Sequence, residues 1–261
     1  MPLAQVMGTT VYQVGYQSAM YGFGLGSEYG ELATLSGAWN DARKISFSRL
    51  QKEAADVGAS AVIGVEVRVK ASAIAAESGI NAIEYTVLGT AVGRDRRQRG
   101  APVLTELSVA DYSKLVEAGF EPVGVVASTA VFFVSAFALS AERQYTFGAS
   151  YQTNYEVKSV TECFYAAREQ VVAEISREAR ALGASGIVGT RITHNAAPQT
   201  IGGMNIGEGQ RTVVIVTMSA IGTAIREEGR QAGARSIRAP MQTIDLLSQR
   251  SARRPSRQPG I

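Results

Sequence analysis

Apolar residues recur at alternating three- and four-residue steps in two stretches of the chain, which is the spacing of one face of an α-helix. The later stretch reads Phe164, Ala167, Val171, Ile175, Ala179 and Leu182. The earlier stretch reads Trp39, Ala42, Ser46, Leu50, Ala54 and Val57, with Ser46 as its one polar member. Both predicted helices end at a glycine, Gly58 or Gly183, because glycine adopts the left-handed conformation that closes a helix.

The residues around the two helices repeat as well, and they alternate as strands do. A predicted strand follows each helix, at residues 61–70 and 187–193, and a second strand ends in Gly-Thr-Ala-Val at 89–92 or Gly-Thr-Ala-Ile at 222–225. An opening strand is expected before each helix, at 13–18 and 122–128. The pattern therefore predicts an α+β fold made of two tandem β-α-β-β units.

The boundaries of these units follow from changes in composition. We expect unit 1 at residues 1–93, a basic linker at 94–102, unit 2 at 103–226 and an arginine-rich, mostly disordered tail at 227–261. Unit 2 begins with an extra short helix at 108–119, which Ser108 and Asp111 are predicted to cap. Ser159 and Glu162 have the spacing of a capping box at the start of the later long helix.

The chain of 27.6 kDa contains one cysteine, Cys163, so it cannot form an internal disulfide, and we expect a cytoplasmic protein. The uncharged run from Pro122 to Ala141 approaches the length of a membrane span. It is rich in valine, serine and threonine, however, which favours a buried strand. No integral membrane span is therefore expected.

Positive charge is concentrated in the tail. Residues 229–261 hold seven arginines and one aspartate, whereas the whole chain has a net charge of +3. The tail, with Arg250, Arg253, Arg254 and Arg257 near its end, has three interpretations: a solubilising end, an electrostatic contact to nucleic acid or anionic lipid, or a peptide that docks on a partner. An anionic partner for the tail is thus one open alternative.

The helix-to-strand junction, with Ala42-Arg43, Glu53-Ala54 and Gly58-Ala59-Ser60-Ala61-Val62-Ile63-Gly64, resembles the YbjQ-like family. The resemblance covers residues 8–93 and, more loosely, 120–226. It implies a dodecin-like fold that associates into homo-oligomeric rings, typically pentamers. The family is described as heavy-metal-binding, so the resemblance implies a heavy-metal cofactor; the residues leave the cofactor unknown, and two units on one chain depart from the family's single unit.

The candidate site residues are few. His194 and Cys163 are the chain's one histidine and one cysteine and its weak metal candidates, because transition-metal sites need clustered ligands. Two charges recur at equivalent helix positions, Arg43 with Arg168 and Glu53 with Glu178, and are predicted to form ion pairs between subunits, to line a shared cavity, or to be solvated. No catalytic residue is identified, since a nucleophile-histidine arrangement cannot be built around the single histidine.

Three function classes follow. The first is a non-catalytic homo-oligomeric scaffold or binding module that holds a small ligand or metal at subunit contacts. The second is a nucleic-acid- or membrane-associated module that acts through the tail, and the third is an enzyme. We favour the first, because a three-stranded sheet with one helix leaves edges and an apolar face uncovered, and association covers them.

Overall fold

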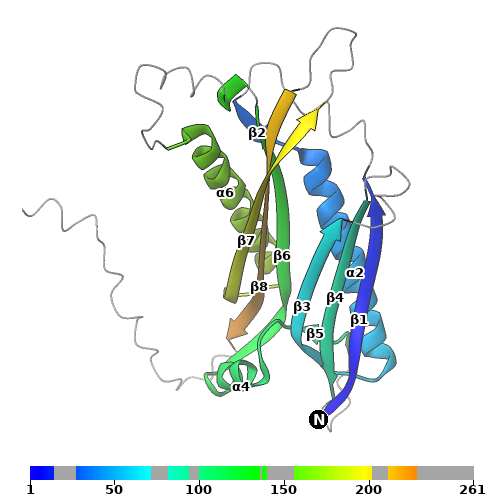
Figure 1. Cartoon of the computed structure of the whole chain (residues 1–261). Helices are drawn as coiled ribbons and strands as arrows, with labels where there is room; N and C mark the ends of the chain where they lie inside the picture. Colours follow the sequence, from blue (N-terminus) through cyan, green and yellow to red (C-terminus); the bar gives the residue numbers. More distant parts are fainter. Residues whose placement is uncertain are drawn as a thin grey trace, which may run out of the picture. The chain divides into compact units, whose positions relative to one another are not determined.

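Two four-stranded sheets, each packed against one long helix, make up most of the chain (Figure 1). The structure is a computed structural model and describes residues 1–14, 28–71, 82–93, 100–135, 137–139, 156–201 and 211–227. This mixture of helices and sheets confirms the predicted α+β fold class. The unit boundaries at residues 93 and 103 stay a prediction, as does the disordered state of the tail, which lies outside the described residues.

The first sheet has the strand order β1-β4-β3-β5. Its strands are β1 (Pro2–Gln13), β3 (Ala61–Ala71), β4 (Ala82–Val92) and the short β5 (Val103–Leu104). Strand β4 is antiparallel to both of its neighbours, whereas β5 is parallel to β3. Helix α2 (Ala33–Asp56) packs on β1 and β4. In the strand order, β1 is an edge strand and lies at the opposite end of the sheet from β5.

The second sheet has the order β2-β6-β8-β7, in which β6-β8-β7 repeats the order β1-β4-β3 and the short fourth strand lies at the opposite end. Its strands are β2 (Tyr29–Glu31), β6 (Phe120–Val134), β7 (Gly186–Ile201) and β8 (Arg211–Glu227). Helix α6 (Lys158–Ala181) packs on β6 and β8 as α2 packs on β1 and β4. The short β2 precedes α2 in the chain and yet pairs with β6, so the two sequence halves share a sheet edge.

The two predicted helix stripes form the centres of the two cores. Ala167, Val171, Ile175 and Ala179 are buried beneath α6, and Leu50 and Ala54 are buried beneath α2. Ser46 is fully buried despite its polarity. Its hydroxyl donates to the carbonyl oxygens of Ala42 and Tyr85, each at 2.9 Å, which satisfies the group inside an apolar core.

A bulge recurs in the strand after each helix and explains part of the repeated sequence. Gly64 and Gly189 both have φ of +66°, where glycine avoids the clash of a Cβ atom, and the strand register shifts at each. Opposite the bulges lie Gly89 and Gly222. A Cβ atom on Gly89 would approach Val62 Cγ1 to 2.4 Å, so only glycine fits there.

The segment that follows β5 fills the first bulge. Thr105 donates its N–H to the Val62 carbonyl and accepts at its own carbonyl from Val65, at 2.9 and 3.0 Å. The predicted extra helix is α4 (Val109–Glu117). Ser108 caps it by accepting from the Asp111 N–H at 3.1 Å, which confirms the predicted cap.

Two local predictions are wrong. The opening strand of the first half is Pro2–Gln13, not residues 13–18, of which 15–18 lie outside the described residues. The capping box at Ser159 is also wrong, because the N-cap of α6 is Val157, which makes no side-chain cap bond; Glu162 pairs with Lys158, at 3.5 Å.

The long apolar run belongs to a strand, as its composition predicted. Residues 122–134 lie in β6, which is buried on both faces from Val126 onward. Burial on both faces accounts for the continuous apolar sequence, since each face packs against a helix. Among the described residues, none of the helices combines the length and the apolar content that crossing a membrane requires.

Candidate functional site

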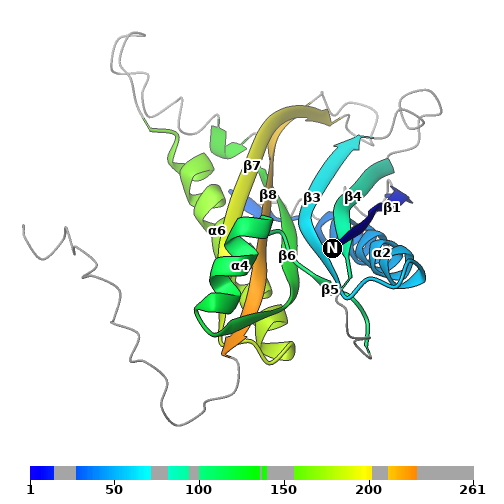
Figure 2. The ribbon, with the colours of Figure 1, turned by 90° about the horizontal axis from the view of Figure 1, so that it is seen from below.

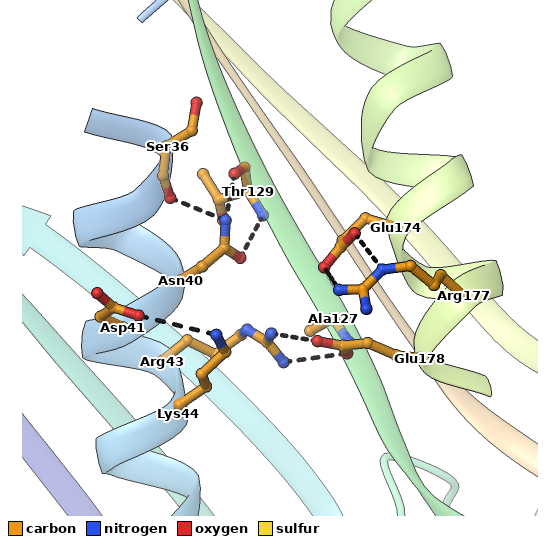
Figure 3. Close-up of polar contacts among 10 residues, drawn as sticks. All are labelled: Ser36, Asn40, Asp41, Arg43, Lys44, Ala127, Thr129, Glu174, Arg177 and Glu178. Carbon is orange, nitrogen blue, oxygen red and sulfur yellow. Dashed lines mark hydrogen bonds and ion pairs between the residues drawn. The ribbon is translucent and has the colours of Figure 1, made fainter. Parts of the chain in front are cut away.

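A bidentate ion pair joins the two sequence halves. The guanidinium of Arg43 on α2 donates to both carboxylate oxygens of Glu178 on α6, at 2.6 and 3.3 Å (Figure 3). The side chains are 8% and 21% exposed, so water competes little with the pair. Bidentate charge-assisted bonds of this kind fix geometry as well as adding energy. Arg43 and Glu178 were both predicted candidates, and they meet within one chain.

The Glu178 carboxylate also binds the edge of β6, because it accepts from the Ala127 N–H at 3.3 Å. The equivalent carboxylate of the first half behaves alike. Glu53 accepts from the N–H of Met7 on β1 at 2.9 Å. In both halves, therefore, a helix carboxylate is anchored on an outward-facing N–H of the opening strand.

Helix α2 takes the place of a neighbouring strand along β6. The Asn40 side chain donates to the Thr129 carbonyl at 2.8 Å and accepts from the Thr129 N–H at 3.1 Å (Figure 3). One turn earlier, the Ser36 hydroxyl accepts from the Val131 N–H at 2.9 Å. These bonds satisfy backbone groups that an edge strand otherwise leaves open.

Sequence reasoning missed Ser36 and Asn40. Together with Arg43 they form a polar stripe on α2 at four- and three-residue spacing, beside the apolar stripe that enters the core. A polar stripe at helical spacing next to a core stripe is the signal that could have found them.

An apolar contact accompanies these polar bonds. Leu32, Val131 and Phe133 form a buried cluster, against which Leu35 and Trp39 pack. On the other face of β6, Val126 and Ala130 pack beneath α6. Helix α2 contacts β6, as the two views of the whole chain show (Figure 1 and Figure 2). The second sheet is thus covered by α6 on one face and, along β6, by α2 on the other.

Other charges near the pair are committed to local contacts. Arg177 holds the Glu174 carboxylate, and its hydrogen bond lowers the pKa of Glu174. Lys44 lies 3.7 Å from Asp41 on the exposed side of α2. Burial raises the pKa of the Tyr85 hydroxyl, which lies close to the Arg43–Glu178 pair. The acids and bases around the Arg43–Glu178 pair neutralise each other, so this charged cluster serves to bind one element to another.

The other two predicted charges are not brought together. Arg168 on α6 and Glu53 on α2 are both exposed, and neither has an ion-pair partner among the described residues. The tail arginines Arg250, Arg253, Arg254 and Arg257 lie outside the described residues.

The metal candidates do not form a site. Cys163 is fully buried in the apolar core beneath α6, and this burial raises the pKa of its thiol to about 12. His194 is exposed on β7 and makes an edge-to-face contact with Phe164, with the ring centres 5.1 Å apart. In the described part of the chain, no three histidine, cysteine or acidic side chains cluster closely enough to hold a metal ion. These residues therefore do not fit a heavy metal.

One pocket of about 620 Å³ lies where β3, β4 and α4 meet the start of β6. Among the described residues that line it, Glu121 is the one acidic side chain, and it is bound by Arg226. Tyr112 and Ser108 are among the few other polar side chains there. The lining offers a small molecule apolar surface and no converging acid, base and nucleophile.

The carboxylate of Glu106, on the segment after β5, is buried without a full complement of partners. The Glu106 side chain is 6% exposed, and neither carboxylate oxygen accepts a hydrogen bond among the described residues. Arg191 lies 3.7 Å away and is exposed. Burial raises the pKa of Glu106, which Arg191 partly opposes.

Comparison with known proteins gives two matches and one absence. Residues 3–94 match a family model, YbjQ, whose description is "Putative heavy-metal-binding". The chain is also 30% identical over 235 residues to the encapsulin nanocompartment protein of Mycobacterium tuberculosis, across 87% of this chain and 79% of the relative. No solved structure matches the chain. The chain therefore belongs to the family of this mycobacterial protein and carries a YbjQ-like domain at residues 3–94.

Proposed function

We propose that this protein is a non-catalytic building block that associates with further copies of itself into a scaffold. The mycobacterial relative is named an encapsulin nanocompartment protein, which supports an assembling role. The described sites support it too, since the charged cluster between the sheets binds elements together and offers no set of catalytic groups.

One observation carries the proposal: the first sheet exposes a surface whose counterpart in the second sheet is buried. Met7 and Val11 on β1 are 51% and 49% exposed. Their register in the first sheet is equivalent to that of Ala127 and Val131 on β6 in the second. Ala127 and Val131 are 3% and 2% exposed beneath α2. Large apolar side chains on an uncovered edge strand favour association with another chain.

The finer form of the proposal is that the two halves are tandem dodecin-like units and that the copies close into a ring, with the pentamer of the YbjQ-like family as the reference. A cytoplasmic location belongs to the same proposal. The repeated strand order β1-β4-β3 and β6-β8-β7 supports the tandem units. A small ligand, if one is bound, is expected at contacts between copies or in the pocket beside α4.

Sedimentation equilibrium of the full chain at several concentrations tests self-association. We expect a mass that is a multiple of 27.6 kDa and that persists on dilution into the low-micromolar range. A mass of one chain at every concentration would refute the proposal. Sedimentation with and without added Zn²⁺ separates metal-driven from metal-independent assembly, and we expect the same mass in both.

A second candidate rests on the charge of the tail, with seven arginines against one aspartate in residues 229–261. Such a segment supports binding to nucleic acid or anionic lipid. Deleting residues 229–261 is expected to abolish low-salt binding to DNA and to anionic vesicles under this candidate. Unchanged binding by the shortened chain would exclude it.

A further inference from the structure

The junction between the two halves is directional. The first half contributes a helix face, with Ser36, Asn40 and Arg43 of α2, and the second contributes the edge of β6 with Glu178. Among the described residues, no hydrogen bond or ion pair makes the reverse contact, from α6 to the edge of β1. A contact between different surfaces of two similar units leaves one surface of each kind open and can repeat from copy to copy.

The open helix face lies on α6. The helix repeat places Thr161, Tyr165 and Arg168 where α2 has Ser36, Asn40 and Arg43. Tyr165 is 67% exposed, and Arg168 is exposed as well. Arg168 keeps the arginine and Thr161 keeps the hydroxyl. This face therefore presents the same charge as the face buried in the junction, and a similar hydroxyl group.

The open sheet surface lies on β1 and carries the complementary charge. Glu53 accepts from the Met7 N–H as Glu178 accepts from the Ala127 N–H, so its carboxylate is anchored in the orientation that receives Arg43 in the second half. Unlike Glu178, it has no arginine bound to it among the described residues. Arg168 is the equivalent arginine, and within the described part of the chain it too has no ion-pair partner.

The helix faces of α2 and α6 differ at one position, and the two strands that they face differ at the matching position. Tyr165 replaces the amide of Asn40, which binds the Thr129 carbonyl. On β1 the equivalent carbonyl of Thr9 already accepts from Arg49, so a donor from the partner helix is not required there. A tyrosine ring instead offers apolar area to Met7 and Val11, which are half exposed around Thr9.

We propose that α6 of one copy packs on the exposed face of β1 of the next copy, with Arg168 bound to the partner's anchored carboxylate at position 53 and Tyr165 covering Met7 and Val11. This inference rests on the proposed self-association and names the surfaces that carry it. The contact between copies then has the geometry of the contact within each copy. Assembly by this contact needs no metal and no tail.

Charge reversal tests the contact. Arg168→Glu and Glu53→Arg are each expected to raise the dissociation constant between copies at least tenfold, because like charges then face each other. The double variant, Arg168→Glu with Glu53→Arg, restores the pairing in reversed sense and is expected to regain most of the assembly. Arg180→Glu is the matched control, since it makes the same charge change on an exposed position of α6 about 18 Å from Arg168 along the helix.

Sedimentation equilibrium measures the mass of each variant, and far-UV circular dichroism shows that each is folded. If both single variants keep the wild-type mass, the contact is wrong while self-association stands. A wild-type chain that is itself monomeric overturns both. Cross-linking gives a second measurement: Tyr165→Cys combined with Thr9→Cys, treated with a short bis-maleimide, is expected to give a ladder in steps of 27.6 kDa. Modified single chains without a ladder would also overturn the contact.

Discussion

Asn40 and Thr129 are joined by two hydrogen bonds of opposite direction, so that one side-chain amide completes the backbone of a strand residue. An amide has the same donor and acceptor as a peptide unit, which lets a helix residue stand in for the next strand of a sheet. The first half of the chain thereby closes the edge of the second sheet without adding a full strand. The corresponding edge of the first sheet, β1, is the surface that we propose binds another copy.

Replacing Asn40 by alanine is expected to destabilise the fold by about 2 kcal/mol, because the buried N–H and carbonyl of Thr129 both lose their partner. Urea unfolding followed by circular dichroism measures the change. Asn195→Ala on the exposed side of β7 is the control and is expected to change the free energy of unfolding by less than about 0.5 kcal/mol. Equal effects of the two substitutions would contradict this role of Asn40.

Removing one member of the buried Arg43–Glu178 ion pair should lower the free energy of unfolding more than removing both members. Arg43→Ala leaves the Glu178 carboxylate without its counter-ion and is expected to cost about 3 kcal/mol, the low end for a buried pair because Glu178 is 21% exposed. Arg43→Met with Glu178→Leu is expected to be more stable than Arg43→Ala, since no unpaired charge is left. Thermal unfolding compares them at equal chain concentration.

The exposed pair of Arg68 and Glu66 on β3 provides the control for that comparison. Both side chains are more than half exposed, so Arg68→Ala should leave the melting temperature almost unchanged. A loss on Arg68→Ala as large as that on Arg43→Ala would mean that burial of the Arg43 pair does not determine its contribution.

Two glycine-to-alanine substitutions are expected to act in opposite directions. Gly89→Ala puts a Cβ atom 2.4 Å from Val62 Cγ1 and should destabilise the fold by about 1–3 kcal/mol through overpacking. Gly37 lies exposed in α2 with nothing within 4 Å of its would-be Cβ, so Gly37→Ala should stabilise by about 0.5–1 kcal/mol. Denaturant titration gives both values, and a destabilising Gly37→Ala would contradict the assignment of an unstrained helix position.

The buried acid Glu106 predicts a pH dependence with a definite sign. Its pKa is raised in the folded state, so the folded chain binds more protons than the unfolded chain between the two pKa values. The free energy of unfolding therefore falls as the pH rises above the unfolded pKa of about 4.3 and through the folded pKa. Low pH, where Glu106 is protonated in both states, removes this penalty.

Glu106→Gln tests the sign, because glutamine keeps the shape and carries no charge. The variant is expected to be more stable than the wild type at pH 7 and equally stable near pH 4, as measured by thermal unfolding in matched buffers. If glutamine lowers stability by the same amount at both pH values, the carboxylate is not the source of the penalty.

The sequence predicted the helices and most of the strands, because their apolar spacing reflects direct packing. It misplaced β1 because Gly8 stands on its buried face. A Cβ atom there would lie 2.0 Å from the Ser46 carbonyl oxygen, so close helix packing replaces a large apolar residue and weakens the alternation. The register of β1, with Val6 opposite Gly89 as Val126 lies opposite Gly222, becomes visible only in the sheet.

The candidate site was predicted in part. The repeat identified two sets of equivalent charges, Arg43 with Arg168 and Glu53 with Glu178. Which arginine binds which carboxylate depends on which unit lies beside which, and helical spacing does not carry that information. Ser36 and Asn40 were not identified, because their partners are backbone groups of a distant strand. Backbone partners leave no trace in the side-chain sequence of that strand.

Native mass spectrometry of the full chain, purified without added metal, tests self-assembly most directly. We expect a defined species whose mass is an integral multiple of 27.6 kDa and which gives single chains of 27.6 kDa after denaturation. Any mass beyond that multiple, lost on denaturation, would identify a bound ligand. A native spectrum that contains the 27.6 kDa chain alone would contradict self-assembly.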